Sequence, residues 1–157
     1  MASVLCFAVL LLISRQQLLT SAADGGACSG WIPLSGRCFK YFQTPESFAK
    51  AESHCVSNDS HLVSLRSKEE LEFLRTLVYI VNADIKSVWT GGYNRPEDEE
   101  WKWSDGTTFP QILWNWGERN IDTVGNCMVM NIPVSESVYF DNLKCTEERS
   151  YVCSKDM

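Results

Sequence analysis

The sequence predicts an α+β domain held by disulfide bonds. Three observations carry this prediction: two amphipathic helical segments in the first half, short strand-like segments in the second half, and six cysteines beyond a predicted leader. The chain has 157 residues, a length that fits one compact domain. We therefore expect a single domain over residues 24–157.

The chain begins with a segment typical of a secretory signal peptide, residues 1–23. An apolar run of ten residues extends from Val4 to Ile13, which is too short to span a bilayer. Small residues follow, and we predict cleavage after Ala23. An uncleaved membrane anchor is the alternative, but the polar residues 14–17 argue against it. We expect a secreted, extracellular protein without membrane insertion.

The cysteine pattern agrees with an exported chain. Cys6 leaves with the signal, and the remaining six predict a disulfide framework. They are Cys28, Cys38, Cys55, Cys127, Cys145 and Cys153. Zinc binding is the rival interpretation, but no two of them have the two-residue spacing of a zinc knuckle. The cysteines alone do not select one pairing.

The charge balance excludes two classes of partner. The net charge is −6, and removal of Arg15 with the signal leaves 13 basic against 20 acidic residues, or about −7. Nucleic acids and anionic lipids require a basic face, so neither is expected as a partner.

The sequence shows no catalytic motif around its two histidines. No Gly-x-Ser-x-Gly motif accompanies His54 and His61, and we expect that the protein is not an enzyme.

Two helices are predicted in the first half of the chain. Thr44 is expected to cap the first, with Pro45 at its first helical position. Its buried face is predicted to contain Phe48, Ala51 and Cys55. Residues 67–70 form a capping box that opens the second helix. The apolar stripe of that helix is Leu71, Leu74, Leu77, Val78 and Val81.

After about residue 87 the pattern changes to short strands and turns. The predicted strands are residues 87–90, ending at Gly91-Gly92, residues 101–103, 127–130, 137–140 and 151–153. A turn is predicted at residues 104–106. The stretch from Thr107 to Asn126 is long for a loop in a compact domain, which favours a functional role.

Several motifs occur in a fixed order. They are CSGW at 28–31, CFKY at 38–41, WTGG at 89–92, WKWSDG at 101–106 and WNWGE at 114–118. Together with the cysteines they resemble the C-type lectin domain family in its long form, notably small secreted fish lectins and type II antifreeze proteins. The resemblance covers residues 28–153. It implies a C-type lectin-like fold with the pairing Cys28–Cys38, Cys55–Cys153 and Cys127–Cys145.

The resemblance also implies a calcium site at which a sugar completes the ion's shell with two hydroxyls. Calcium takes ~6–8 oxygen ligands. The family supplies them from a Glu-Pro-Asn or Gln-Pro-Asp triplet, a later acid, and a Trp-Asn-Asp triplet. This chain has Glu118-Arg-Asn120 and Phe140-Asp-Asn142 at the two triplets. The metal and sugar ligands it implies are therefore Glu118, Asn120, Asp141 and Asn142.

Two departures from the family pattern leave two interpretations open. Arg119 replaces the proline, and a cis bond before a non-proline residue costs ~2.5–4 kcal/mol. Gly125 stands where the later acid is expected, with Asp122 as the nearest substitute. The stretch holds either a calcium site no tighter than ~10⁻⁴–10⁻³ M or a degenerate loop in a domain that kept its fold. By family analogy, Glu-x-Asn favours mannose-type hydroxyls.

Three minor features complete the pattern. Asn94 and Asp98 match ligands of an auxiliary ion site in some relatives, with a solvated acidic turn at 97–100 as the simpler interpretation. Asn58 opens a glycosylation sequon. We expect packing roles for the aromatic residues at 89, 101, 103, 109, 114 and 116, with one ring stacked on a sugar as the alternative.

The sequence therefore predicts a secreted carbohydrate-binding lectin, with calcium as its cofactor if the ion site holds, that recognises microbial glycans in innate immunity. Its expected partners are glycans or glycoproteins, and the sugar and oligomeric state stay open. One alternative is a lectin-fold protein that binds a protein or lipid. The last alternative is an ice-binding antifreeze protein, although no regular threonine array is present.

Overall fold

The computed structural model describes residues 26–95, 97, 100–110, 118–120, 125–132 and 138–157, with the backbone alone for 118–120 and 139. The predicted signal peptide lies outside these ranges. Within the described residues, the chain divides into two compact units, one of residues 26–38 with 156–157, and the other within residues 39–155. In the described ranges, no helix is long and apolar enough to cross a membrane.

The smaller unit contains a short β structure and a disulfide. Its strands are β1 (Ile32–Leu34) and the first residues of β2 (Arg37–Glu46). A tight turn separates them, in which Gly36 has φ +81°, a conformation that glycine adopts without a steric penalty. Cys28 and Cys38 form a disulfide with a Cα–Cα distance of 5.4 Å, as the family resemblance implied.

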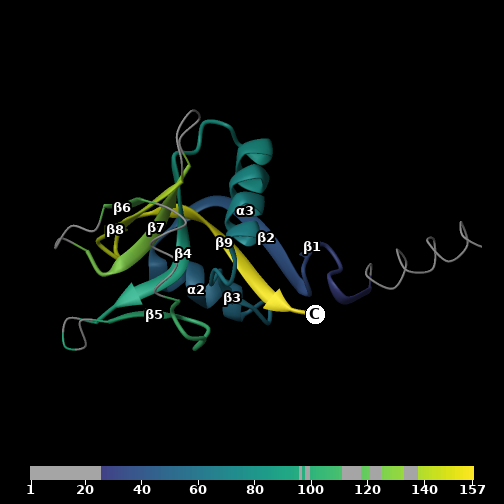
Figure 1. Ribbon diagram of the computed structural model, residues 1–157, viewed down its shortest axis with the longest axis horizontal. Coiled ribbons are helices and arrows are strands. Elements are labelled where there is room, and N and C mark those ends of the chain that lie inside the picture. The colour runs from purple at the N-terminus through teal and green to yellow at the C-terminus, as the bar shows by residue number, and fades with distance from the viewer. Residues whose placement is uncertain (1–25, 96, 98–99, 111–117, 121–124, 133–137) are drawn as a thin grey trace, which may run out of the picture. The chain divides into compact units, whose positions relative to one another are not determined.

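The larger unit is built on a mixed sheet (Figure 1). The strand order is β2-β9-β4-β7-β8-β6, with β3 paired to β9 and β5 paired to β4. The strands are β3 (His61–Leu62), β4 (Ser87–Asn94), β5 (Trp101–Trp103), β6 (Glu118–Asn120), β7 (Cys127–Asn131), β8 (Tyr139–Leu143) and β9 (Arg149–Asp156). The predicted α+β class is confirmed, although the β4–β9 and β6–β8 pairs are parallel.

The first helix begins later than predicted. α2 spans Phe48–Val56 with Ser47 at its N-cap, and residues 44–45 belong to the end of β2. Ser47 makes no side-chain cap hydrogen bond. The Phe48 N–H instead donates to the carbonyl of Cys145 at 3.1 Å. A distant backbone group therefore satisfies the first helical donor in place of a local side chain.

The second helix, α3 (Lys68–Val81), begins where its capping box predicted. The Ser67 side chain accepts from the Glu70 N–H at 3.1 Å, and the Glu70 carboxylate accepts from the Arg66 N–H at 2.8 Å. The predicted stripe is buried at Leu71, Leu74, Leu77 and Val78. The prediction was wrong for Val81, which is 46 % exposed at the last turn.

β4 continues through the two glycines where the strand was predicted to end. A Cβ on Gly91 would lie 2.7 Å from the Leu62 carbonyl oxygen, and one on Gly92 would lie 2.8 Å from the Met128 Cβ. These glycines therefore permit a close approach inside the strand and do not form a turn. The register of β4 against β7 shifts between Trp89 and Tyr93, as a β-bulge would shift it.

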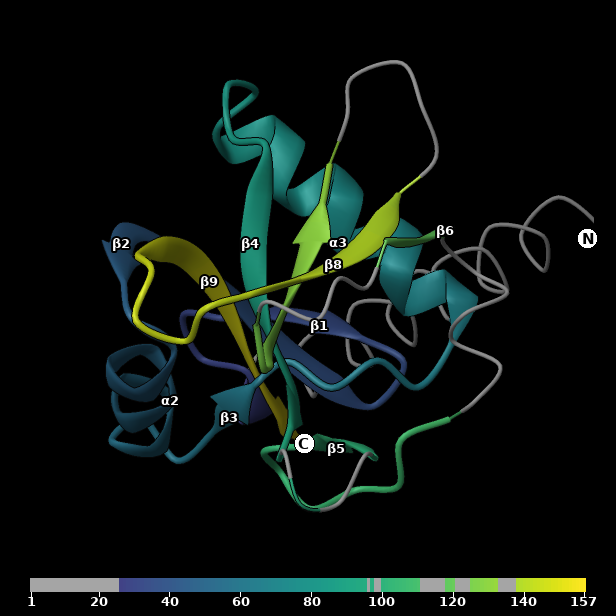
Figure 2. The ribbon, with the colours of Figure 1, turned by 90° about the vertical axis from the view of Figure 1, so that its left-hand side faces the viewer.

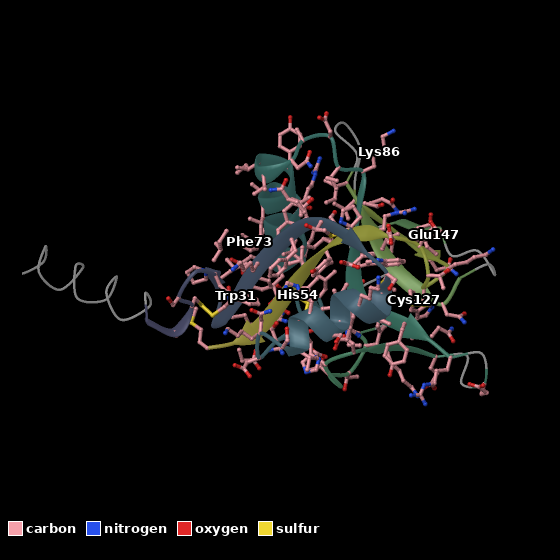
Figure 3. The ribbon with its side chains drawn as sticks, turned by 180° about the vertical axis from the view of Figure 1, so that it is seen from behind. Trp31, His54, Phe73, Lys86, Cys127 and Glu147 are labelled. Atoms are coloured by element: carbon pink, nitrogen blue, oxygen red, sulfur yellow. A yellow bond between two sulfur atoms is a disulfide. The ribbon has the colours of Figure 1, made fainter. Side chains whose placement is uncertain are left out.

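Buried side chains from both helices and most strands form the core of the larger unit. Its largest fully buried members include Phe39, Leu62, Leu65, Leu71, Leu74, Trp89, Trp103, Met128, Met130 and Phe140. The other two disulfides also match the implied pairing: Cys55–Cys153 joins α2 to β9, and Cys127–Cys145 joins β7 to the turn after β8 (Figure 3).

Candidate functional site

The two triplets that the sequence singled out lie next to each other along one strand pair. β6 runs parallel to β8, with Glu118 paired to Tyr139 and Asn120 paired to Asp141. Figure 2 shows β6 beside β8 at the edge of the sheet, away from α2. The backbone therefore brings together segments that are about 20 residues apart in the sequence, as a shared site requires. The side chains of residues 118–120 lie outside the described part of the structure.

Asp141 and Asn142 are placed very differently. Asp141 is half-buried, and its Oδ1 accepts from the Asn142 N–H at 2.8 Å. Asn142 is only 4 % exposed, and its Nδ2 donates to the carbonyl of Gly125 at 2.5 Å. Neighbouring residues of a strand point to opposite faces of the sheet. Asp141 is therefore the more accessible of the two expected ligands. Asn142 instead holds Gly125, at the end of the loop that precedes β7.

Gly125 explains why the later acid of the family pattern is absent. A Cβ at this position would lie 2.1 Å from the carbonyl carbon of Leu143 and 2.2 Å from its oxygen. No side chain fits at that distance without a backbone shift. The alternative acid, Asp122, lies outside the described residues.

The described residues fit a calcium ion only in part. Asp141 offers a carboxylate, whereas the shell of calcium contains ~6–8 oxygen atoms. Among the residues that the structure describes, no group of three or more His, Cys, Asp or Glu could hold a metal ion. Any further ligands at this edge would come from Glu118 and Asn120, whose side chains lie outside the described part of the structure.

The second acidic cluster is not assembled in the described part of the chain. Asn94 ends β4, and its N–H donates to the carbonyl of Asn126 at 2.9 Å. Glu97 and Glu100 are exposed, and Asp98 lies outside the described residues. The auxiliary ion site therefore stays a prediction, as does the solvated acidic turn.

The aromatic residues pack as expected where the structure describes them. Trp89 and Trp103 are buried, and Phe109 lies against Trp103 with ring centroids 4.8 Å apart. Trp101 is half-buried, 6.4 Å from the Phe109 ring. Positions 114 and 116 lie outside the described ranges, so a sugar-stacking ring there stays a prediction.

The surroundings of His54 were not predicted from the sequence. Its Nδ1 lies 2.6 Å from the Tyr151 hydroxyl, and its ring meets the Phe42 ring edge-on at 4.7 Å. Lys50, Ser53 and Ser57 lie on the same helix face as His54, and this polar stripe at helical spacing was the available signal. The aromatic partners come from β2 and β9, which helix spacing does not predict.

The geometry and the disulfides are those of a C-type lectin domain. The sequence model of the family described as Lectin C-type domain matches residues 44–155. The chain therefore belongs to the C-type lectin domain family.

Individual relatives agree with this assignment. The chain is 36 % identical over 120 residues to ladderlectin of Oncorhynchus mykiss, covering 74 % of this chain and 63 % of that protein. It is 26 % identical over 162 aligned positions to the galactose-specific lectin nattectin of Thalassophryne nattereri, with 100 % of both covered. A solved calcium-dependent type II antifreeze protein in its calcium-free form is similar, with a TM-score of 0.67, 25 % identity, and 81 % and 98 % of the two chains covered. The predicted resemblance to fish lectins and antifreeze proteins is confirmed.

Proposed function

We propose that the protein is a secreted, non-enzymatic lectin that binds glycans at the β6–β8 edge of its sheet. The observation that carries the proposal is the register in which Glu118 and Asn120 pair with Tyr139 and Asp141. It supports a shared site because it aligns both family triplets in a chain that belongs to the C-type lectin family. Microbial surface glycans are the proposed targets, and innate immune recognition is the proposed role.

Three residues are proposed as ligands of a weak calcium site. Glu118 and Asp141 would supply carboxylate oxygens, and Asn120 an amide oxygen, all of the hard type that calcium prefers. We assign Asn142 a supporting role, because its amide nitrogen is bound to the Gly125 carbonyl. A bound calcium ion leaves coordination positions that two sugar hydroxyls can fill. With so few protein ligands, we expect an affinity no tighter than ~10⁻⁴–10⁻³ M.

Two further assignments belong to this proposal. The Glu-x-Asn triplet supports mannose-type hydroxyls, whereas the name of nattectin supports galactose, so both sugars are the first probes. Asn58 is exposed on the turn that follows α2, and we propose that it carries an N-linked glycan.

Affinity retention combined with calorimetry tests the proposal. The purified mature protein is applied to immobilised mannose and immobilised galactose with calcium, and then washed with EDTA. We expect retention on one of the two sugars, release by the chelator, and calcium binding in the millimolar range. Glu118→Ala should abolish both retention and calcium binding without changing the thermal melt.

Glu148→Ala is the matched control, because Glu148 is an exposed acid outside the proposed site. It should bind sugar and calcium like the wild type. If Glu118→Ala still binds sugar, the assigned residues are wrong. If the wild type binds no sugar but retains a protein or lipid, the protein is an interaction module with a lectin fold.

Ice binding is a second candidate function. The similarity to a type II antifreeze protein at a TM-score of 0.67 and 25 % identity favours it. Thermal hysteresis in the wild type, together with no sugar retention, would select this function over glycan binding.

A further inference from the structure

A groove of about 650 Å³ lies between β2, α2 and β9. In the strand order, β4 and β7 separate β2 and β9 from the β6–β8 edge, and Figure 2 shows α2 and β6 far apart, with β9, β4 and β7 between them. The volume of the groove falls within the ~300–1,000 Å³ that pockets for small ligands occupy. The groove is therefore separate from the proposed calcium site.

The walls of the groove are fixed by contacts at the end of β2. The Glu46 carbonyl accepts from the Trp89 indole Nε1–H at 2.9 Å, which holds the strand end against β4. The Phe48 N–H donates to the Cys145 carbonyl at 3.1 Å, which holds the first turn of α2. Trp89 is fully buried, so this end of the groove is anchored in the core.

Unused hydrogen-bonding groups line both walls. Gln43 and Thr44 come from β2, and Ser53 comes from the face of α2 that also carries Lys50 and Ser57. Gln43, Thr44 and Ser53 are exposed, and their side chains have no hydrogen-bond partner among the residues that the structure describes. A ligand in the groove would meet hydroxyl and amide groups that can donate and accept hydrogen bonds.

The floor of the groove is aromatic, and the imidazole ring of His54 borders it. Phe42 stacks on Tyr151 with centroids 5.2 Å apart and planes at 18°, and it meets edge-on the ring of His54, which is labelled in Figure 3. Burial and the charge of Glu46 raise the pKa of Tyr151, so its hydroxyl stays protonated, and this hydroxyl lies 2.6 Å from the His54 Nδ1. Because Tyr151 engages Nδ1, Nε2 is the ring nitrogen of His54 that can hydrogen-bond a ligand.

The charges of the groove balance each other. Lys50 Nζ lies 3.7 Å from the Glu46 carboxylate, and Glu46 is the single carboxylate among the lining residues. A cation and an anion that pair with each other favour an uncharged ligand, and one engaged carboxylate is too few for calcium. Hydroxyl and amide walls above an aromatic floor complement the hydroxyls and the apolar face of a sugar ring.

We propose that this groove is a second, calcium-independent binding site for a neutral saccharide. It goes beyond the β6–β8 site and shares none of its residues. With two sites on one chain, the second binding event on a branched glycan becomes intramolecular, and avidity rises without new contacts.

Ligand-observed NMR in excess EDTA tests the groove. The probes are the methyl glycosides of mannose, galactose and glucose, together with lactose, each added to the mature protein. We expect saturation transfer to at least one probe. Ser53→Trp fills the groove and should abolish the signal, and Thr44→Val removes a hydroxyl and should weaken it. Ala49→Trp is the matched control, because Ala49 is exposed on the same helix but does not line the groove.

The outcomes separate this proposal from the first. A signal in EDTA that Ser53→Trp abolishes and Ala49→Trp keeps supports the groove, even if Glu118→Ala shows the β6–β8 site to be wrong. No signal for any probe in EDTA overturns the groove and leaves calcium-dependent retention untouched. A signal that survives Ser53→Trp also overturns it, and equal thermal melts of the variants exclude misfolding as the cause.

Discussion

Gly125→Asp restores the acid that the family pattern expects two residues before Cys127, and we predict that it destabilises the domain without creating a calcium ligand. The new Cβ would lie 2.1 Å from the carbonyl carbon of Leu143 and 2.6 Å from its Cα. These are backbone atoms, so a change of side-chain rotamer does not relieve the contact.

The size of the effect follows from how firmly Leu143 is held. Leu143 pairs with Cys127 in the β7–β8 ladder, and the Cys127–Cys145 disulfide closes the same segment. Overpacking costs ~1–3 kcal/mol, and separating the Asn142 amide from the Gly125 carbonyl leaves buried polar groups unpaired at ~1–3 kcal/mol. We expect the free energy of unfolding to fall by about 3 kcal/mol, and the melting temperature by roughly 10 °C.

Urea unfolding and calcium titration of four proteins check this prediction. Gly125→Ala introduces the same Cβ without charge and should lose nearly as much stability as Gly125→Asp. Asn126→Asp adds the same charge at an exposed neighbouring position and should unfold like the wild type. A Gly125→Asp protein that is as stable as the wild type, or that binds calcium more tightly, would contradict the packing effect expected at Gly125.

Two other variants probe the fold itself. Replacing Cys55 and Cys153 together with alanine opens a loop with a sequence separation of 98, which should lower stability in thermal melts by up to ~4.7 kcal/mol; a loss below ~1 kcal/mol would contradict the chain-entropy model here. Burial opposes the ionisation of Asp105, but hydrogen bonds from the Ser64 and Thr107 hydroxyls and the charge of Arg66 hold its pKa below 3.8. The ionised carboxylate therefore adds to the free energy of unfolding above that pH. This stabilisation is lost as the pH falls through the lower pKa of the folded state. Asp105→Asn should remove this part of the acid dependence, and parallel stability profiles between pH ~2 and ~5 would show the assignment to be wrong.

The sequence predicted those elements whose ends depend on local chemistry. α3 begins at Ser67 because its hydroxyl bonds a backbone N–H three residues ahead, a pattern visible in the sequence. The start of α2 was misplaced because a distant carbonyl, that of Cys145, satisfies its first donor. β6 was not predicted, since Glu-Arg-Asn shows no apolar alternation and forms a strand only against β8.

The candidate site was predictable in its components but not in its packing. The family resemblance named both triplets, and the register places their backbones side by side. Neither the contact between Gly125 and Leu143 nor the bond from Asn142 has a sequence signal, because each depends on how two strands approach. The groove was not predicted for a similar reason. The helical spacing of polar residues indicates only its α2 wall, whereas Tyr151 comes from the last strand, far away in the sequence.

The order of Asp141 and Asn142, which reverses the family triplet, follows from the burial of the two side chains. A carboxylate at position 142 would be buried against the Gly125 carbonyl, with two acceptors facing each other and no donor between them. Burying an unpaired charge is far more costly than burying an amide that donates a hydrogen bond. The contact with Gly125 therefore favours asparagine at position 142. Position 141, which pairs with Asn120, is the one in this triplet where a charged side chain can remain exposed to solvent. It follows that protein contacts hold the end of the loop at Gly125.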